Sequence, residues 1–176
     1  MKKLLALFIA VALCLTFAGC VTVDESPVKD TGANNNETKP TEQKKELTFG
    51  INETAAFSTL KITANEIKQS EGDGFFVPEA GKVFVGVKFT IENISDEEQT
   101  ISSLLMFEGY VNDVKCAYSF NAACAFDEGT LDGSLAPGKK LVGWYALEVP
   151  ADWSTIELDV QHDILSNNPA KFVFTK

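Results

Sequence analysis

A repeat of two residues over residues 82–92, with one consistently apolar face, constrains the fold more than any other feature of this sequence. Successive side chains of an extended strand point to opposite faces, so this pattern predicts a strand with one buried and one solvated face. The apolar face carries Val83, Val85, Val87, Phe89 and Ile91. Phe84 and Gly86 fall among the polar side chains, which predicts either local cover or the side chain of a neighbour over them.

The same period of two recurs between residues 47 and 176. It predicts further strands at residues 60–64 and 155–161, while residues 140–149 are more continuously apolar, as a central strand would be, and residues 172–174 indicate a short last strand. Residues 106–111 and 114–120 flank Asn112 and Asp113, which are predicted to form a hairpin tip. Pro137 and Gly138 favour a type II turn, and residues 103–107 favour one helical turn. This pattern predicts an all-β, antiparallel β-sandwich of about seven to nine strands over residues 47–176, with a closed barrel as the structural alternative.

The amino-terminal stretch has the pattern of a secretory signal. Lys2 and Lys3 precede an apolar run that closes with small residues and Cys20. Residues 17–20 resemble a bacterial lipobox, although Phe17 stands where leucine is usual, so Cys20 is expected to carry a covalent diacylglyceryl lipid and residues 1–19 to be removed. A membrane-spanning helix needs about 20 apolar residues, which this run does not supply without polar ones. A plain secreted form is the other alternative.

Residues 20–46 are predicted to form a lipidated cysteine followed by a disordered polar linker. After Val28 this stretch has Ala33 as its single apolar residue, too little to offset the entropy of ordering. A flexible chain of this length spans roughly 25–30 Å. The expected order is therefore signal peptide, linker and a single β-sandwich domain.

Charge excludes one class of partner. The chain has 15 basic against 25 acidic residues, a net charge of −10, and its basic residues are all lysine. Because affinity for phosphate backbones depends on cationic contacts, no nucleic-acid partner is expected.

Cys116 and Cys124 are the cysteines that remain after the signal peptide and the lipid site are set aside. Outside the membrane they could form a disulfide across a hairpin or short loop, and we favour that bridge over the alternative of two small buried side chains. With one distant histidine, His162, they make an incomplete metal site, so no metal is expected.

Three large apolar residues, Phe75, Phe76 and Val77, stand in a segment rich in glycine and acid. Exposed, they would form an interaction loop. Buried, they would fasten the loop to the sandwich, and we favour burial because apolar patches are uncommon on soluble domains.

No catalytic residue is predicted. A hydrolytic triad needs a base, and His162 is the single imidazole, without a Gly-x-Ser-x-Gly motif elsewhere. Acidic groups could still perform glycosidase chemistry: Asp96 to Glu98, Asp127 with Glu128, and Glu157 with Asp159. Turns and a solvated strand face explain them without added assumptions.

Residues 81–93, a long strand that ends in Asn93, resemble family 4352 of domains of unknown function. So do residues 135–140, then Gly143, and the strand end at residues 147–150. The resemblance implies an immunoglobulin-like sandwich of a kind frequently carried on lipoproteins of Gram-positive bacteria. Its motifs are strands and turns, so no site residue follows from it, and the two cysteines lie outside it.

Together these features predict a non-enzymatic lipoprotein on the extracellular face of the cell membrane, without a cofactor beyond the lipid on Cys20. Its domain would bind an unidentified envelope protein or wall polymer. The alternatives are an envelope glycan hydrolase with an acidic pair, and an accessory subunit of a transporter.

Overall fold

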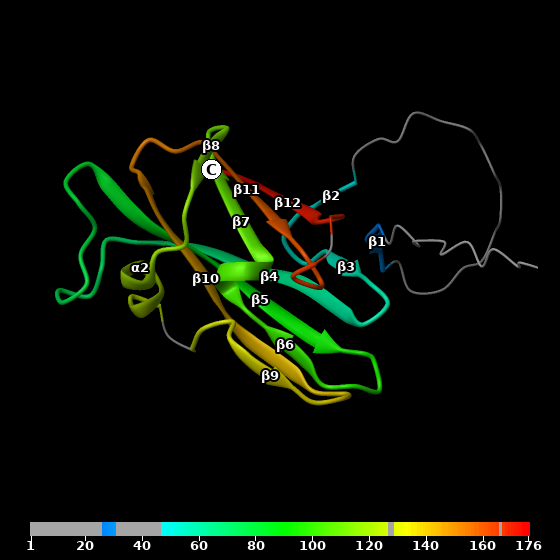
Figure 1. Cartoon of the computed structure of the whole chain (residues 1–176). Coiled ribbons are helices and arrows are strands. Elements are labelled where there is room, and N and C mark those ends of the chain that lie inside the picture. The colour runs from blue at the N-terminus through cyan, green and yellow to red at the C-terminus, as the bar shows by residue number, and fades with distance from the viewer. Residues whose placement is uncertain (1–25, 31–46, 127–128, 166) are drawn as a thin grey trace, which may run out of the picture.

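The computed structural model describes residues 26–30, 47–126, 129–165 and 167–176. Cys20, the signal peptide and most of the expected linker lie outside the described residues. Two five-stranded sheets pack face to face, as predicted for a β-sandwich (Figure 1). Within the described ranges, no helix has the length and apolar character needed to cross a membrane.

The first sheet has the order β1-β3-β4-β5-β10 and is antiparallel throughout. Its strands are β1 (Val28–Lys29), β3 (Thr54–Ala56), β4 (Leu60–Ser70), β5 (Lys82–Asn93) and β10 (Lys140–Pro150). The predicted strand at residues 82–92 is thus confirmed as the centre of the long β4-β5-β10 unit. The predicted strand at residues 60–64 continues to Ser70 after a bulge at Asn65, where the pairing with β5 shifts by one residue.

The second sheet has the order β2-β12-β11-β7-β8, with a parallel pairing between β2 and β12. Its strands are β2 (Thr48–Phe49), β7 (Phe107–Val111), β8 (Val114–Cys116), β11 (Thr155–Val160) and β12 (Ala170–Thr175). Asn112 and Asp113, at φ 48° and 66°, form the predicted tip between β7 and β8. A small third sheet pairs β6 (Gln99–Ile101) with β9 (Gly133–Leu135), and α1 (Ser103–Met106) is the predicted helical turn.

The core lies between the two large sheets and is centred on aromatic rings. Phe89 on β5 contacts Phe107 and Phe172 from the opposite sheet, with ring centroids 5.4 and 5.3 Å apart. Tyr145 on β10 stacks on Phe107 at 5.1 Å. Edge-to-face and offset contacts at these distances suit the ring quadrupole. The face predicted from sequence to be apolar is therefore the face that forms the core.

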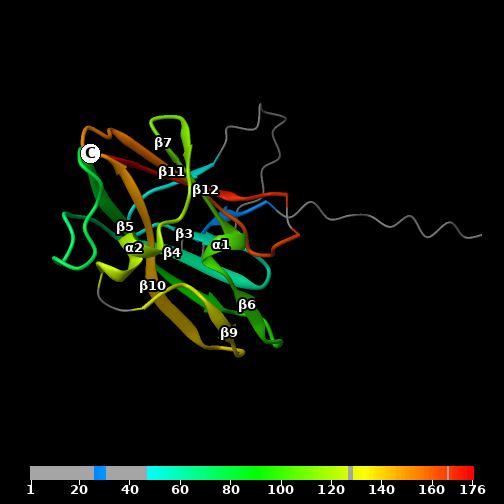
Figure 2. The ribbon, with the colours of Figure 1, turned by 60° about the vertical axis from the view of Figure 1, so that its left-hand side comes forward.

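The opposite face of the first sheet is also covered, in part. The second helix, α2 (Phe120–Cys124), packs on β5 and β10 (Figure 2). Ala122 and Ala123 of this helix bury Phe84 and Ala146 of the sheet. The cover predicted over Phe84 and Gly86 is thus confirmed, because Phe126, just after α2, lies close to Gly86. We call this group of Phe84, Ala122, Ala123 and Ala146 the outer cluster.

Residues 26–30 differ from the prediction of a linker disordered along its whole length. Val28 and Lys29 pair with Ala56 and Ala55 of β3. Lys29 Nζ contacts Glu53 Oε1 at 2.5 Å, and Val28 remains 60% exposed. Backbone pairing and an ion pair hold this strand, and neither of them depends on apolar composition.

Candidate functional site

The loop between β4 and β5, residues 71–81, presents the apolar residues singled out from sequence. Phe75 is 84% exposed and Val77 is 60% exposed, whereas Phe76 is half-buried. The preference for burial is therefore wrong for Phe75 and Val77. It holds in part for Phe76, which packs against the outer cluster. We call Phe75, Phe76 and Val77 the apolar loop.

Hydrogen bonds inside the loop give it a defined shape. Asp73 Oδ1 accepts hydrogen bonds from the backbone N–H of Phe75 at 2.9 Å and of Phe76 at 2.8 Å. The N–H of Asp73 donates to the carbonyl of Phe76 at 3.2 Å. The rings of Phe75 and Phe76 meet edge to face at 4.9 Å. Phe75 is thus held outward on a turn that its neighbours build.

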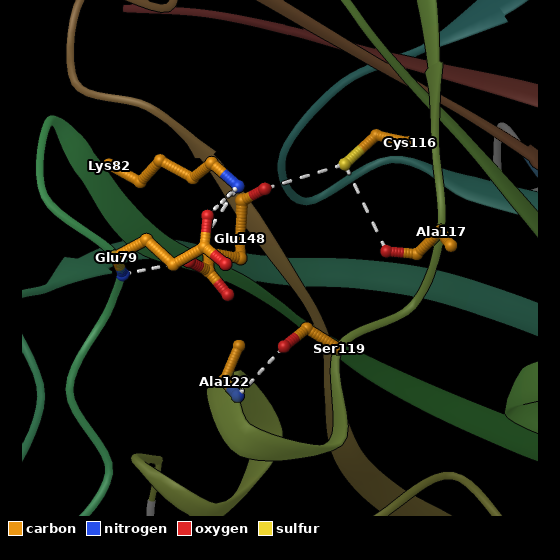
Figure 3. A network of polar contacts seen from close by, with 7 residues as sticks. All are labelled: Glu79, Lys82, Cys116, Ala117, Ser119, Ala122 and Glu148. Atoms are coloured by element: carbon orange, nitrogen blue, oxygen red, sulfur yellow. Dashed lines mark hydrogen bonds and ion pairs between the residues drawn. The ribbon is translucent and has the colours of Figure 1, made fainter.

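The far end of the loop is tied to β10 (Figure 3). The backbone N–H of Glu79 donates to Glu148 Oε1 at 2.8 Å. Lys82 Nζ lies 2.6 Å from Glu79 Oε2 and 3.9 Å from Glu148 Oε1. The hydrogen bond with Lys82 lowers the pKa of Glu79, and the bond with Glu79 raises the pKa of Lys82. The far end of the loop is therefore fixed to the sandwich.

A second exposed apolar side chain lies near the loop. Phe120, 64% exposed, begins α2, whose Ala122 and Ala123 belong to the outer cluster that Phe76 contacts. Figures 1 and 2 both show the loop beside this helix. Ser119 Oγ accepts a hydrogen bond from the N–H of Ala122 at 3.2 Å and caps the helix. No helix was predicted at α2, although Ser119 followed by an alanine-rich stretch is a signal typical of a helix start.

Cys116 and Cys124 are free thiols, in place of the predicted disulfide. Cys116 ends β8, and its Sγ lies 3.6 Å from the carbonyl oxygen of Glu148. The chain then follows β10, where Tyr118 pairs with Leu147, before it turns into α2. The spacing suggested a hairpin or short loop, but these residues cross from one sheet to the other. Burial raises the pKa of the Cys116 thiol.

The acidic groups considered for glycosidase chemistry are dispersed. Glu157 and Asp159 share Lys171, at 3.2 and 3.6 Å. Residues 96–98 lie in the connection after β5, and Asp127 and Glu128 lie outside the described residues. His162 stacks on Phe57 at 4.6 Å. Among the residues that the structure describes, no group of three or more His, Cys, Asp or Glu side chains could hold a metal ion.

Gly72 should be indispensable for the shape of the loop. Its φ is +92°, and a Cβ atom there would lie 2.1 Å from the carbonyl oxygen of Phe76. We expect Gly72→Ala to displace residues 73–77 and to remove amide exchange protection at Phe75 and Phe76. Gly74→Ala is the matched control, because φ is +91° there but nothing lies within 4 Å of the added atom. Equal loss of protection in both variants would show that backbone strain, about 1–2 kcal/mol, is the whole effect.

Loop order should also depend on pH through Asp73. The hydrogen bonds from the N–H groups of Phe76 and Phe75 lower the pKa of Asp73 below its ordinary value of 3.8. Because the pKa of Asp73 is lower in the folded state than in the unfolded state, its carboxylate stabilises the loop fully at a pH above the unfolded-state pKa. This stabilisation is lost as the pH falls through the folded-state pKa. We expect exchange protection at Phe75 and Phe76 to be constant above about pH 5 and to fall below about pH 4. Asp73→Asn should flatten this profile.

The fold and the site define a class: a small β-sandwich protein that presents a fixed apolar loop beside a short helix. The chain belongs to the family described as "Domain of unknown function (DUF4352)", whose sequence model matches residues 49–171. The resemblance seen in the strand and turn motifs is thereby confirmed. A comparison with curated proteins gives no match.

Three solved structures share the fold. An uncharacterised β-sandwich protein from Clostridium difficile is 22% identical with a TM-score of 0.52, and the match covers 78% of this chain and 99% of that one. The yjhA protein from Bacillus subtilis is 16% identical with a TM-score of 0.56, over 72% and 97%. A "putative lipoprotein" (ycdA) from Bacillus subtilis is 13% identical with a TM-score of 0.53, over 66% of this chain and 36% of that one. At these identities the likeness establishes the fold alone.

Proposed function

We propose that this protein is a lipid-anchored, non-catalytic interaction module on the extracellular face of the cell membrane, and that the apolar loop is its contact with an envelope protein. The observation that carries the proposal is the exposure of Phe75, 84%, on a turn fixed by Asp73. Aromatic side chains held outward at little further entropic cost are the usual anchors of protein interfaces.

The surroundings of the loop indicate the chemistry of the partner. Glu71, Asp73 and Glu79 are exposed around the apolar residues. An apolar centre with an acidic rim is complementary to an apolar groove with a basic rim. This pattern favours a protein partner over a wall polymer rich in hydroxyl or anionic groups, because the latter would bury the phenylalanine rings poorly.

The anchor part of the proposal rests on Cys20, and a structure of similar fold that is described as a "putative lipoprotein" supports it. Metabolic labelling with a fatty-acid analogue tests it directly. We expect incorporation into the native chain and none into the Cys20→Ala variant. A native chain that carries no acyl group, or one that still begins at Met1, would contradict the anchor.

Photo-crosslinking in intact cells tests the contact. A photoreactive phenylalanine at position 75 should give one discrete adduct with an envelope protein. The same probe at position 165 is the matched control, because Leu165 is 82% exposed in the connection between β11 and β12. The same adducts from both positions, or none from position 75, would reject the loop as the contact. The full chain is used, since a fragment from residue 47 would lack β1.

The non-catalytic part has its own test. The purified chain should not turn over a panel of envelope glycans. Turnover that disappears when Glu157 or Asp159 is replaced by its amide would instead establish the hydrolase alternative.

A further inference from the structure

Exposed apolar side chains also gather at the end of the sandwich that lies opposite the apolar loop. Leu165 is 82% exposed and Ile164 is 54% exposed in the connection between β11 and β12, and Val28 on β1 is 60% exposed. We call these three residues the β1-side patch. Strand β4, eleven residues long, separates this end from the apolar loop by about 35 Å. Figures 1 and 2 both show the β11–β12 connection beside β1 and the apolar loop at the other side of the molecule.

Contacts between β1, β3 and the connection bring the patch together. Val28 pairs with Ala56, the last residue of β3. Phe57 comes next in the chain and stacks on His162 in the connection, with ring centroids 4.6 Å apart. The two apolar residues of the connection begin two positions after His162, so they belong to the same end of the sandwich as Val28.

Strand β1 is held to the sandwich by side chains as well as by its pairing with β3. Lys29 Nζ lies 2.5 Å from Glu53 Oε1 and 5.7 Å from the centroid of the Phe49 ring on β2. Asp30 Oδ2 lies 2.5 Å from Lys61 Nζ on β4. Because Phe49 belongs to the second sheet, β1 contacts both large sheets.

The exposed leucines of α1 lie beside the same connection. Leu104 is 70% exposed and Leu105 is 63% exposed. The N–H of Gln161, the first residue of the connection, donates to the carbonyl of Met106 at 2.8 Å. The apolar surface at this end therefore continues from the connection onto α1.

Few acidic groups interrupt this apolar surface in the connection. Among residues 161–169 the single acidic residue is Asp163, whose Oδ1 accepts a hydrogen bond from the N–H of Leu165 at 3.1 Å. Residues 71–81, around the apolar loop, carry Glu71, Asp73 and Glu79. A chain with a net charge of −10 is repelled by an anionic lipid surface. Contact with a bilayer is therefore less costly through the connection than through the apolar loop.

The length of chain before β1 places this end nearest to the lipid of the proposed function. Cys20 precedes Ser26, the first described residue, by six positions. Six residues span at most about 22 Å even when fully extended. With β1 paired to β3, residues 31–46 come after the docked strand and add nothing to this distance. A lipid on Cys20 therefore keeps the β1 end close to the membrane surface.

We propose that the β1-side patch contacts the outer surface of the bilayer in which Cys20 is anchored. Ile164 and Leu165 enter the headgroup region, and the apolar loop then faces away from the bilayer, toward an envelope partner. A few aliphatic side chains do not hold a protein on a bilayer, since even one myristoyl chain binds only reversibly. The contact therefore depends on the anchor, which raises the effective concentration of lipid at the patch. The proposal rests on the lipid anchor of the proposed function and adds the orientation of the domain.

Photo-crosslinking in intact cells tests this contact, with a photoreactive phenylalanine at position 165 of the full chain. We expect adducts with phospholipid, detected as an added lipid mass on the purified chain. Position 114 is the matched control, because Val114 is 69% exposed in the β7–β8 hairpin, at the opposite end of β7 from the connection. The yield of lipid adduct should be at least fivefold higher at position 165 than at position 114.

A charge reversal tests the part that β1 has in this orientation. Lys29→Glu replaces the ion pair with Glu53 by repulsion and should release β1, so that residues 31–46 lengthen the tether. The yield of lipid adduct at position 165 should then fall at least threefold. Glu53→Lys in the same chain should restore the yield, because the reversed pair is again attractive. Circular dichroism of the purified variants checks that the sandwich remains folded.

The outcomes separate this inference from the proposed function. The acyl mass on Cys20, measured on the same purified chain, reports the anchor by itself. Equal lipid adducts at positions 165 and 114, or none at position 165 of an acylated chain, would overturn the inference alone. A discrete protein adduct at position 165 would make the patch a protein interface instead. Leu165 remains a valid control for capture of the envelope partner, because that measurement is made after the bilayer has been solubilised.

Discussion

Replacing Phe75 by aspartate should weaken capture of the envelope partner by about 30-fold or more, because truncation of an aromatic anchor removes about 2 kcal/mol or more of binding free energy. Aspartate adds a charge that the apolar contact would have to desolvate, which increases the loss. The measurement is quantitative capture from solubilised envelopes, with the partner identified by crosslinking at position 75.

Stability should be unaffected by the same change. Phe75 is 84% exposed, and exposed substitutions usually alter the free energy of unfolding by less than about 0.5 kcal/mol. Leu165→Asp is the control for a general effect of replacing an exposed apolar side chain, since Leu165 is 82% exposed. If both variants lose the partner equally, or if Phe75→Asp retains it, the apolar loop is not the contact.

Replacing Asn93 by alanine should destabilise the fold by about 2–4 kcal/mol, because it removes four hydrogen bonds and leaves buried backbone groups unsatisfied. Asn93 is fully buried at the end of β5. Its Nδ2 donates to the carbonyls of Glu97 at 2.7 Å and of Leu135 at 2.8 Å. Its Oδ1 accepts from the N–H of Ser95 at 2.9 Å and from the hydroxyl of Ser95 at 2.7 Å. One side chain thus joins β5, the following turn and β9.

Urea denaturation followed by circular dichroism measures this effect as a change in the free energy of unfolding. Asn93→Asp keeps the oxygen that faces Ser95 but cannot donate to the two carbonyls, so it separates the two halves of the network. An Asn93→Ala variant within about 0.5 kcal/mol of the native chain would show that water replaces the amide without loss.

Local sequence pattern was sufficient to predict most of the long strands. Residues 82–92 and 155–161 were predicted within one residue at each end, because their alternation reflects burial on one sheet face. Residues 140–149 were predicted equally closely from a continuous apolar run typical of a central strand, whereas β10 stands at the end of the order of its sheet and α2 packs on it. The polar face of β5 was informative too. Phe84 and Gly86 did not fit a solvated face, and the structure covers them with α2 and Phe126.

The predictions that failed concern segments whose environment lies far away in sequence. Burial of Phe75 was expected from composition, yet Phe76 takes the place against the outer cluster, whose residues come from β5, α2 and β10, and Phe75 is left exposed. A bridge between Cys116 and Cys124 was expected from spacing, yet the chain crosses between sheets at that point. Strand β1 was missed because its support comes from Glu53 and the edge of β3.

The amino-acid sequence by itself determined which face of each long strand is apolar and where the chain turns, since both depend on neighbouring residues. Only the tertiary structure decided how Lys68, Lys88 and Trp144 meet and which phenylalanine of the loop is exposed. The meeting of those three side chains depends on the register between strands and on the bulge at Asn65. The exposure of the loop residues depends on contacts of the loop with α2 and β10. Pairings between residues distant in sequence leave no periodic signal along the chain.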